Sequence, residues 1–320
     1  MSVPHSPGSL NDKDSSFTAP HDSSSDSVFS YTEAEEKRVR LKLNLTVLPL
    51  LFLGFYVFQL ERGNISNALT DGFLIKVGIT QDEFNIGQAL LFVGIILGEL
   101  PSQYVLQWIG PQVSDAIRLA SEIADSQLWI SFQVMAFGLV ATCQAFQHNY
   151  ASFLVTRILL GITECGYIPG ALYTLSTYYK RSELATVTAI FFLGNTLASA
   201  TSGLLAYGIL PLGAKHPQYH GWQWLMLIEG SMALCVSCLL IAFLPGSPIR
   251  PRPLFLPIRY FTDREERIVA HRVVLDDHAK SDSSRRLAMK EVSDTLGNWR
   301  IWPHVLMAIA YIAPTSALGT

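Results

Sequence analysis

Long, uninterrupted apolar runs are the feature that most constrains this chain. Each run is near the roughly 20 residues that an α-helix needs to cross about 30 Å of hydrocarbon. Only 15% of the 320 residues are charged and 49% are hydrophobic, whereas about a quarter of a soluble domain is charged. Most of the charge lies in residues 1–42 and 245–302. The sequence therefore predicts an all-α membrane protein.

Six apolar runs predict six membrane-spanning helices, and a seventh run begins near the C-terminus. The six helices are expected at about residues 43–62, 84–106, 128–146, 150–179, 187–210 and 222–244. The seventh opens at Pro303 and is still apolar at Thr320, so we expect a truncated chain. The expected units are a disordered tail (1–36), a six-span bundle (37–244), a charged loop (245–302) and the start of span seven (303–320).

The distribution of basic residues predicts the orientation of these spans. Four Lys and Arg residues precede the first span, and eleven lie in residues 245–302. Short segments rich in Lys and Arg stay in the cytoplasm, so we expect the N-terminus and the charged loop there, in a multi-pass protein of the plasma membrane. Six spans, a long loop and a further span are typical of a transporter built from two six-helix halves.

Several other classes of protein are disfavoured. The basic residues lie beside the spans without base-stacking aromatics among them, which argues against nucleic-acid binding. The four cysteines fall in apolar runs, so we interpret the C-x-x-C of Cys235 and Cys238 as small apolar residues rather than a metal or redox site. No clustered metal ligands or nucleophile with its base appear. We expect neither an enzyme nor a cofactor.

Ionisable residues inside the expected spans are the sharpest functional signal: Glu61, Arg62, Arg157 and Glu164. Each costs about 2.5–3.5 kcal/mol in a membrane unless it faces a cavity or finds a partner. Arg157 and Glu164 are seven residues apart and therefore share a helix face, about 10 Å apart along the axis. Two guanidiniums suit a carboxylate ligand, and two carboxyls suit proton exchange. The alternative is internal ion pairing that holds the bundle together.

Two stretches resemble known family signatures. Residues 61–68, Glu-Arg-Gly-Asn-Ile-Ser-Asn-Ala, resemble the D-R-x-N-I-x-N-A signature of the fungal anion:cation symporter family, within the major facilitator superfamily. Residues 157–170 are similar to that family's R-x-L-L-G-x-x-E-x-G-x-x-P-G. Shorter matches include Glu99-Leu100-Pro101-Ser102 and Glu229-Gly230. The resemblance covers about residues 33–320, and residues 261–267 and 298–304 resemble the branch that includes allantoate permease-like transporters.

The resemblance implies import of a small organic anion driven by protons, with known family substrates such as allantoate, ureidosuccinate, nicotinate, pantothenate and biotin. By motif position, Arg62 and Arg157 would bind the anion, and Glu61 and Glu164 would couple protons. Glu61 is Asp in the usual pattern, which lengthens the side chain. Further candidates for the substrate site are Asn64 and Tyr167. Candidates for helix packing and gating are Gly161, Gly166, Pro169 and Gly170.

The sequence departs from the family pattern in two places. Residues 107–111 lack the basic residue that usually precedes Gly-Pro in the loop between spans two and three. Residues 113–127 are additional, and we interpret them as a retained intron, with a short amphipathic cytoplasmic helix as the alternative.

Alternating access needs two halves that move about one site. We therefore expect no transport by this chain alone. The functional alternatives are a non-transporting nutrient sensor or an inactive fragment. A seven-span receptor is disfavoured by the cytoplasmic N-terminus. The sequence does not identify which anion is carried.

Overall fold

The computed structural model describes residues 30–109, 126–246, 248, 251–253, 256, 258–276, 297–307 and 310. Within these residues every regular element is a helix, and six helices are long and apolar enough to cross a membrane. The six spans are α1 (Glu33–Thr70), α3 (Gln81–Ile109), α5 (Ser126–Cys143), α6 (Tyr150–Glu164) continued by α7 (Tyr167–Tyr178), α8 (Arg181–Ile209) and α10 (Gly221–Phe243). The expected all-α fold is confirmed.

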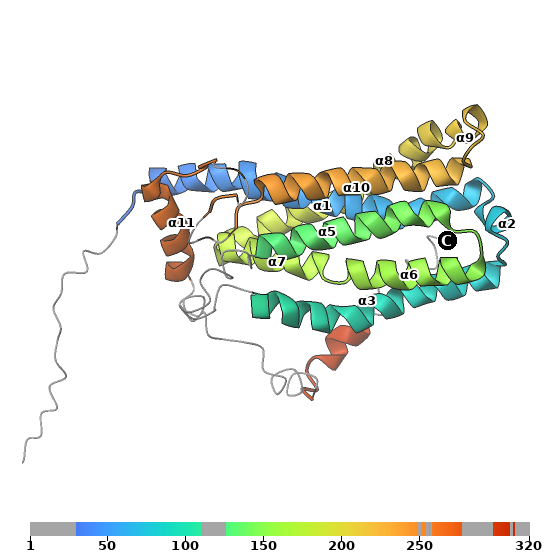
Figure 1. The fold of residues 1–320 in the computed structure, drawn as a ribbon. Coiled ribbons are helices and arrows are strands. Elements are labelled where there is room, and N and C mark those ends of the chain that lie inside the picture. The colour runs from blue at the N-terminus through green and yellow to red at the C-terminus, as the bar shows by residue number, and fades with distance from the viewer. Residues whose placement is uncertain are drawn as a thin grey trace, which may run out of the picture.

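Short helices connect the spans at their ends. The elements α2 (Phe73–Val77), the 3-10 helix η2 (Gln144–Phe146) and α9 (Leu212–Lys215) lie between spans, and α11 (Asp263–Asp276) belongs to the charged loop. Figure 1 shows α2 and α9 at one end of the bundle and α11 at the other end, crosswise to the spans. We call the end with α11, the start of α1 and the α7–α8 junction the α11 end.

Helix α1 begins earlier than the sequence suggested. The tail was expected to reach residue 36, but the helix starts at Glu33, because Thr32 and Glu35 form a capping box. The Glu35 amide donates to Thr32 Oγ1 at 3.3 Å, and the Thr32 amide donates to Glu35 Oε2 at 2.9 Å. Reciprocal bonds of this kind satisfy amides that a helix start leaves without partners.

Three other expectations fall largely outside the described residues. They concern the tail over residues 1–29, most of the additional stretch at 113–127, and most of the seventh span. Of the additional stretch only Ser126 and Gln127 are described, as the start of α5. Of the seventh span, residues 302–307 form a short helical segment.

The fourth span is two helices rather than one. Helix α6 ends at Glu164 and α7 begins at Tyr167, with Cys165 and Gly166 between them. Pro169 explains the break, because its ring has no N–H and clashes with the carbonyl four residues earlier, that of Cys165. The break lies directly after Glu164, so it ends the helix that carries two of the expected site residues.

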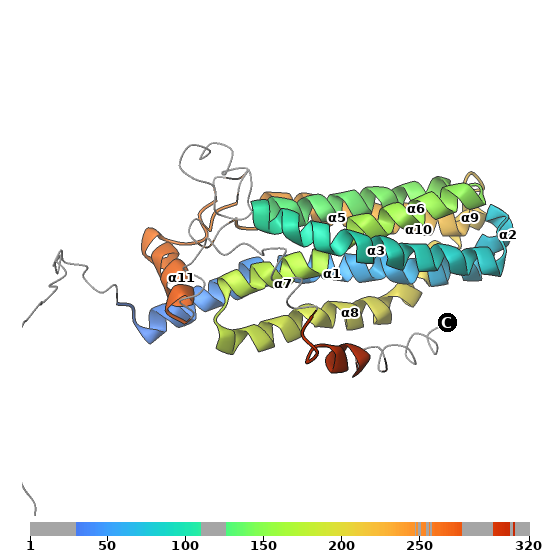
Figure 2. The same cartoon turned by 90° about the horizontal axis from the view of Figure 1, so that it is seen from below.

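The spans pack in pairs around an aromatic core. Extensive contacts join α5 with α10, α3 with α6, and α1 with both α8 and α10, and Figures 1 and 2 show these helices running side by side. The rings of Phe55, Phe58, Phe137, Tyr167 and Phe191 are fully or almost fully buried between them. Helix α6 approaches α3 closely at Gly161, where an added Cβ would lie 2.3 Å from the Leu91 carbonyl oxygen.

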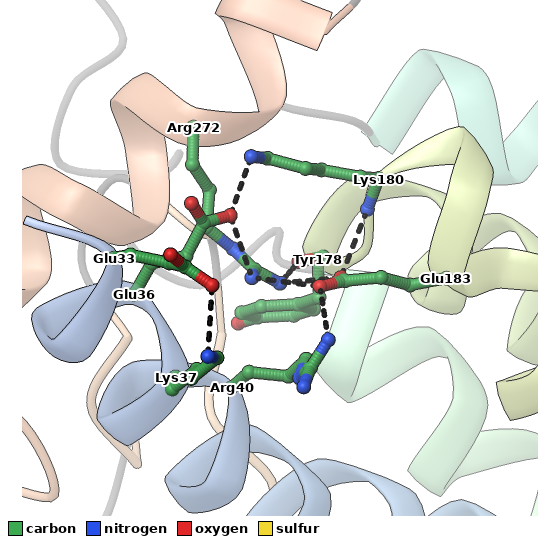
Figure 3. Close-up of polar contacts among 8 residues, drawn as sticks. All are labelled: Glu33, Glu36, Lys37, Arg40, Tyr178, Lys180, Glu183 and Arg272. Atoms are coloured by element: carbon green, nitrogen blue, oxygen red, sulfur yellow. Dashed lines mark hydrogen bonds and ion pairs between the residues drawn. The ribbon is translucent and has the colours of Figure 1, made fainter.

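Ion pairs fasten α11 to the spans at the α11 end. Arg272 of α11 is fully buried, and its Nη2 donates to Glu183 Oε2 at 3.1 Å and to the Tyr178 carbonyl at 3.0 Å. Figure 3 shows Glu36 and Lys180 completing this group. Two more pairs join α11 to α1, Lys42 with Glu265 at 2.6 Å and Arg264 with Glu35 at 2.7 Å. The charged loop is therefore tied to three spans.

Candidate functional site

Polar side chains from four helices converge inside the otherwise apolar bundle. We call this group the polar cluster: Glu61, Arg62 and Asn64 of α1, Gln144 of η2, Arg157 and Glu164 of α6, and Glu229 of α10. All are buried except Arg62. Buried charges in a membrane are retained when they pair with one another or line a path for a solute.

Arg62 and Glu164 form the central ion pair of the cluster. Arg62 Nε donates to Glu164 Oε2 at 3.0 Å, and the Arg62 guanidinium lies over the Phe58 ring, 4.5 Å from its centroid. The Arg62 side chain is 33% exposed, whereas that of Glu164 is fully enclosed. One member of the pair therefore reaches a surface of the bundle while the other does not.

Gln144 bridges the other two predicted charges. Its Nε2 donates to Glu61 Oε1 at 2.8 Å, and its Oε1 accepts a hydrogen bond from Arg157 Nη2. The amide thus joins a carboxylate and a guanidinium that belong to different spans. The Arg157 guanidinium also lies 5.3 Å from the centroid of the Phe153 ring.

Several buried polar atoms of the cluster have no hydrogen-bond partner among the described residues. They are Glu61 Oε2, Asn64 Oδ1 and Nδ2, Arg157 Nε, Glu164 Oε1 and both carboxyl oxygens of Glu229. Buried polar groups are usually paired, so each such atom requires an explanation. Seven such atoms belong to this one cluster, which makes the polar cluster the candidate functional site among the described residues.

The structure brings together five of the six predicted ligand and proton residues. Tyr167 lies apart from the cluster's polar bonds, because its hydroxyl donates to the Leu51 carbonyl at 2.8 Å and its ring stacks on Phe58. Its role in substrate binding stays a prediction. Gly161 and Gly166 lie at close helix contacts, and Gly170 is buried in the first turn of α7. Gating by these residues and by Pro169 stays a prediction as well.

Sequence reasoning did not assign a role to Gln144 or Glu229. Gln144 is uncharged, whereas the residues singled out by burial of charge in the expected spans were all ionisable. Glu229 was noted as part of a motif, although it stands in an apolar run that meets the same criterion as the four chosen residues. Both residues are strongly polar side chains within apolar runs, and that is the sequence signal that points to them.

Comparison with known proteins identifies similar chains. A family model described as the Major Facilitator Superfamily matches residues 51–319. The chain is 30% identical over 281 residues to the "MFS-type transporter efuF" of Hormonema carpetanum, covering 88% of this chain and 52% of that protein. It is 31% identical over 220 residues to a "Putative tartrate transporter" of Agrobacterium vitis, covering 67% and 44%. The chain thus spans about half the length of the curated relatives it matches.

A solved structure shows a similar fold. A bacterial homologue of the human lysosomal transporter Spinster, in an inward-facing and occupied conformation, aligns with a TM-score of 0.50 and 15% sequence identity. The alignment covers 70% of this chain and 46% of that one. At this identity the likeness concerns the fold alone.

Proposed function

Because the chain belongs to the Major Facilitator Superfamily, we propose that it forms one half of a transporter that carries a small organic anion together with a proton. The relatives are named as transporters, and the six apolar helices support a multi-pass membrane protein. Organic-anion symport is our own, finer assignment. It rests above all on the pairing of a partly exposed Arg62 with an enclosed Glu164.

Arg62 is suited to receive a carboxylate. Among the described residues it donates a hydrogen bond only through Nε, which leaves its terminal nitrogens for a ligand. A guanidinium presents a planar fork that matches a carboxylate. Arg157 supplies a second positive charge deeper in the cluster, held by Gln144. Asn64 and Tyr167 remain proposed contributors to the substrate site.

Exchange of ion-pair partners would couple the anion to a proton. An anion that binds Arg62 competes with Glu164 for the same guanidinium. A buried carboxylate without its counter-ion is far more costly than the neutral acid, so Glu164 would take up a proton as the anion binds. Glu61, whose carboxyl acts electrostatically on Glu164, is the second group proposed to hold that proton.

The substrate class and the cellular setting are proposed on separate grounds. The name of the Agrobacterium relative refers to tartrate, a dicarboxylate, which supports an organic acid here; allantoate and nicotinate are the candidates that the sequence motifs favour. The excess of Lys and Arg in the charged loop supports a cytoplasmic α11 end, and the plasma membrane is the location that we propose for a protein that imports an anion. Alternating access needs two halves around one site, so we propose that transport requires a second six-helix half.

Anion binding to the chain in lipid nanodiscs tests this function. Titration with allantoate, nicotinate and tartrate should show saturable binding of at least one anion, and Arg157→Ala should abolish it. Arg259→Ala, which removes an exposed arginine of the charged loop, is the matched control and should bind normally. Absence of binding by every carboxylate, or equal binding by Arg157→Ala, would contradict the proposal.

Uptake by yeast cells separates a transporter from a sensor. Cells that express the chain together with the second half of the Hormonema relative should accumulate the bound anion under a proton gradient, and cells that express the chain alone should not. Accumulation by the chain alone would refute the requirement for a second half. Binding without accumulation in either case would favour the nutrient sensor.

A further inference from the structure

Glu229 is the carboxyl of the polar cluster that has no counter-charge of its own. Arg62 pairs directly with Glu164, and Arg157 is joined to Glu61 through Gln144. Two guanidiniums thus balance two carboxylates, and Glu229 is the third carboxyl. It is 3% exposed, and neither of its oxygens forms a hydrogen bond with a described residue.

The group that faces Glu229 from α1 is the amide of Asn64. Asn64 is 1% exposed, and neither its Oδ1 nor its Nδ2 forms a hydrogen bond within the described part of the chain. The Asn64 amide and the Glu61 carboxyl are the α1 groups that act on Glu229. Glu61 and Asn64 are three residues apart and therefore lie on the same face of α1. From the other side, α5 places Thr142 against Gly230, the residue next to Glu229.

These four unpaired atoms satisfy one another if Glu229 carries a proton. A carboxylic acid and a carboxamide form a ring of two hydrogen bonds: the acid O–H donates to Asn64 Oδ1, and Asn64 Nδ2 donates to the other Glu229 oxygen. An ionised Glu229 has no donor and would leave Asn64 Oδ1 unsatisfied. A buried unpaired carboxylate also costs far more than the neutral acid.

We propose that Glu229 is a third proton-holding residue of this site, kept as a neutral acid by its pairing with Asn64. Its role in coupling rests on the proposed symport: Glu229 holds a proton beside Glu61 and exchanges it when the cluster opens to water. The O–H bond of Glu229 breaks as the proton passes to water, and the carboxylate that remains is then hydrated. In this arrangement the Asn64 amide is the hydrogen-bond partner of the neutral Glu229 acid.

Infrared spectroscopy of the chain in lipid at neutral pH tests the protonation directly. The spectrum of the wild type minus that of Glu229→Gln should contain the carbonyl band of a protonated carboxyl. The glutamine amide can also pair with Asn64, so this variant is expected to fold. Asn64→Ala should shift the band, whereas Asn67→Ala, which removes an amide that donates to the Ser202 carbonyl of α8, should leave it unchanged.

The difference spectrum tests whether Glu229 is a neutral acid, and the test does not depend on transport. Carboxylate bands in place of the acid band would overturn it, as would a band that Asn64→Ala does not move. Failure of the wild type to bind any anion would refute the proposed function but leave the acid band in place. Anion binding by a protein that lacks the acid band would support the proposed function but overturn the inference about Glu229.

Discussion

Arg62 of α1 and Glu164 of α6 form an ion pair 102 positions apart in the chain, with Nε and Oε2 separated by 3.0 Å. The pair joins the two stretches whose motifs stood out in the sequence. Glu164 is enclosed and Arg62 is one-third exposed, so the guanidinium is the member of the pair that the proposed anion would meet first. Binding of that anion would remove the counter-charge from the Glu164 carboxyl.

Substitution of Arg62 by lysine tests whether anion binding requires the planar shape of the guanidinium or only its positive charge. Arg62→Lys keeps a positive charge but loses the planar fork, so we expect the affinity for the anion to fall by about tenfold, the equivalent of one charged hydrogen bond. Arg62→Ala should reduce it further. Titration in nanodiscs measures both. Equal affinity of Arg62→Lys and the wild type would show that the fork contributes nothing.

Removal of the buried arginine at the α11 end should destabilise the protein. Arg272→Ala removes the buried guanidinium that donates to Glu183 and to the Tyr178 carbonyl. The cost should be about 2–3 kcal/mol, somewhat less than for an isolated buried pair because Arg40 remains beside Glu183. Arg259→Ala, at an exposed pair with Asp263, should cost less than about 0.5 kcal/mol. Thermal unfolding of both variants in the same lipid measures the difference, and equal stabilities would contradict the role of Arg272.

Docking of α11 should weaken in acid. Burial alone would raise the pKa of Glu265, but hydrogen bonds from Lys42 and the Thr262 amide, with the charge of Lys42, bring it below its usual value of 4.5. Because the folded pKa is the lower one, the stabilisation is complete above 4.5 and is lost as pH falls through the folded pKa.

Comparison with Glu265→Gln tests this dependence. Glutamine cannot ionise, so docking of α11 in Glu265→Gln should depend less on pH below 4.5 than docking in the wild type. Protection of α11 from proteolysis, measured against pH, reports the docking. Identical profiles for the two proteins would show that Glu265 does not contribute.

A methyl group at Gly161 should disrupt the contact between α6 and α3. The added Cβ would lie 2.3 Å from the Leu91 carbonyl oxygen, which belongs to rigid backbone, so Gly161→Ala should destabilise the fold by about 1–3 kcal/mol. Gly203→Ala in α8 is the control, because no atom of the described residues lies within 4 Å of its Cβ position. It should be neutral or slightly stabilising, since alanine favours helix. Equal effects of the two substitutions would argue against the close approach.

The sequence predicted the spans well because each is a run of apolar residues near the length of a membrane crossing. Local chemistry at the ends was harder to foresee. The Thr32–Glu35 capping box extends α1 into a charged segment that had been assigned to the tail. Pro169 was recognised as a weak point, but the sequence did not show that the helix is interrupted at Cys165 and Gly166, four and three residues before it.

The partners within the site could not be deduced from the sequence. Spacing along one helix shows that Arg157 and Glu164 share a face, but the rotation of α1 against α6 decides that Glu164 binds Arg62. Gln144 enters the site because η2 follows α5 at the level of Glu61. Glu229 faces Asn64 because α10 packs on α1. Each of these relations joins segments that are distant in the chain.

Proton uptake on anion binding tests the central claim most directly. In weakly buffered solution, addition of the anion to the chain in nanodiscs should make the medium more alkaline, because Glu164 takes up a proton as the anion occupies Arg62. Glu164→Gln should still bind the anion but take up fewer protons. Anion binding with no proton uptake by the wild type, or with the same uptake by Glu164→Gln, would contradict the account.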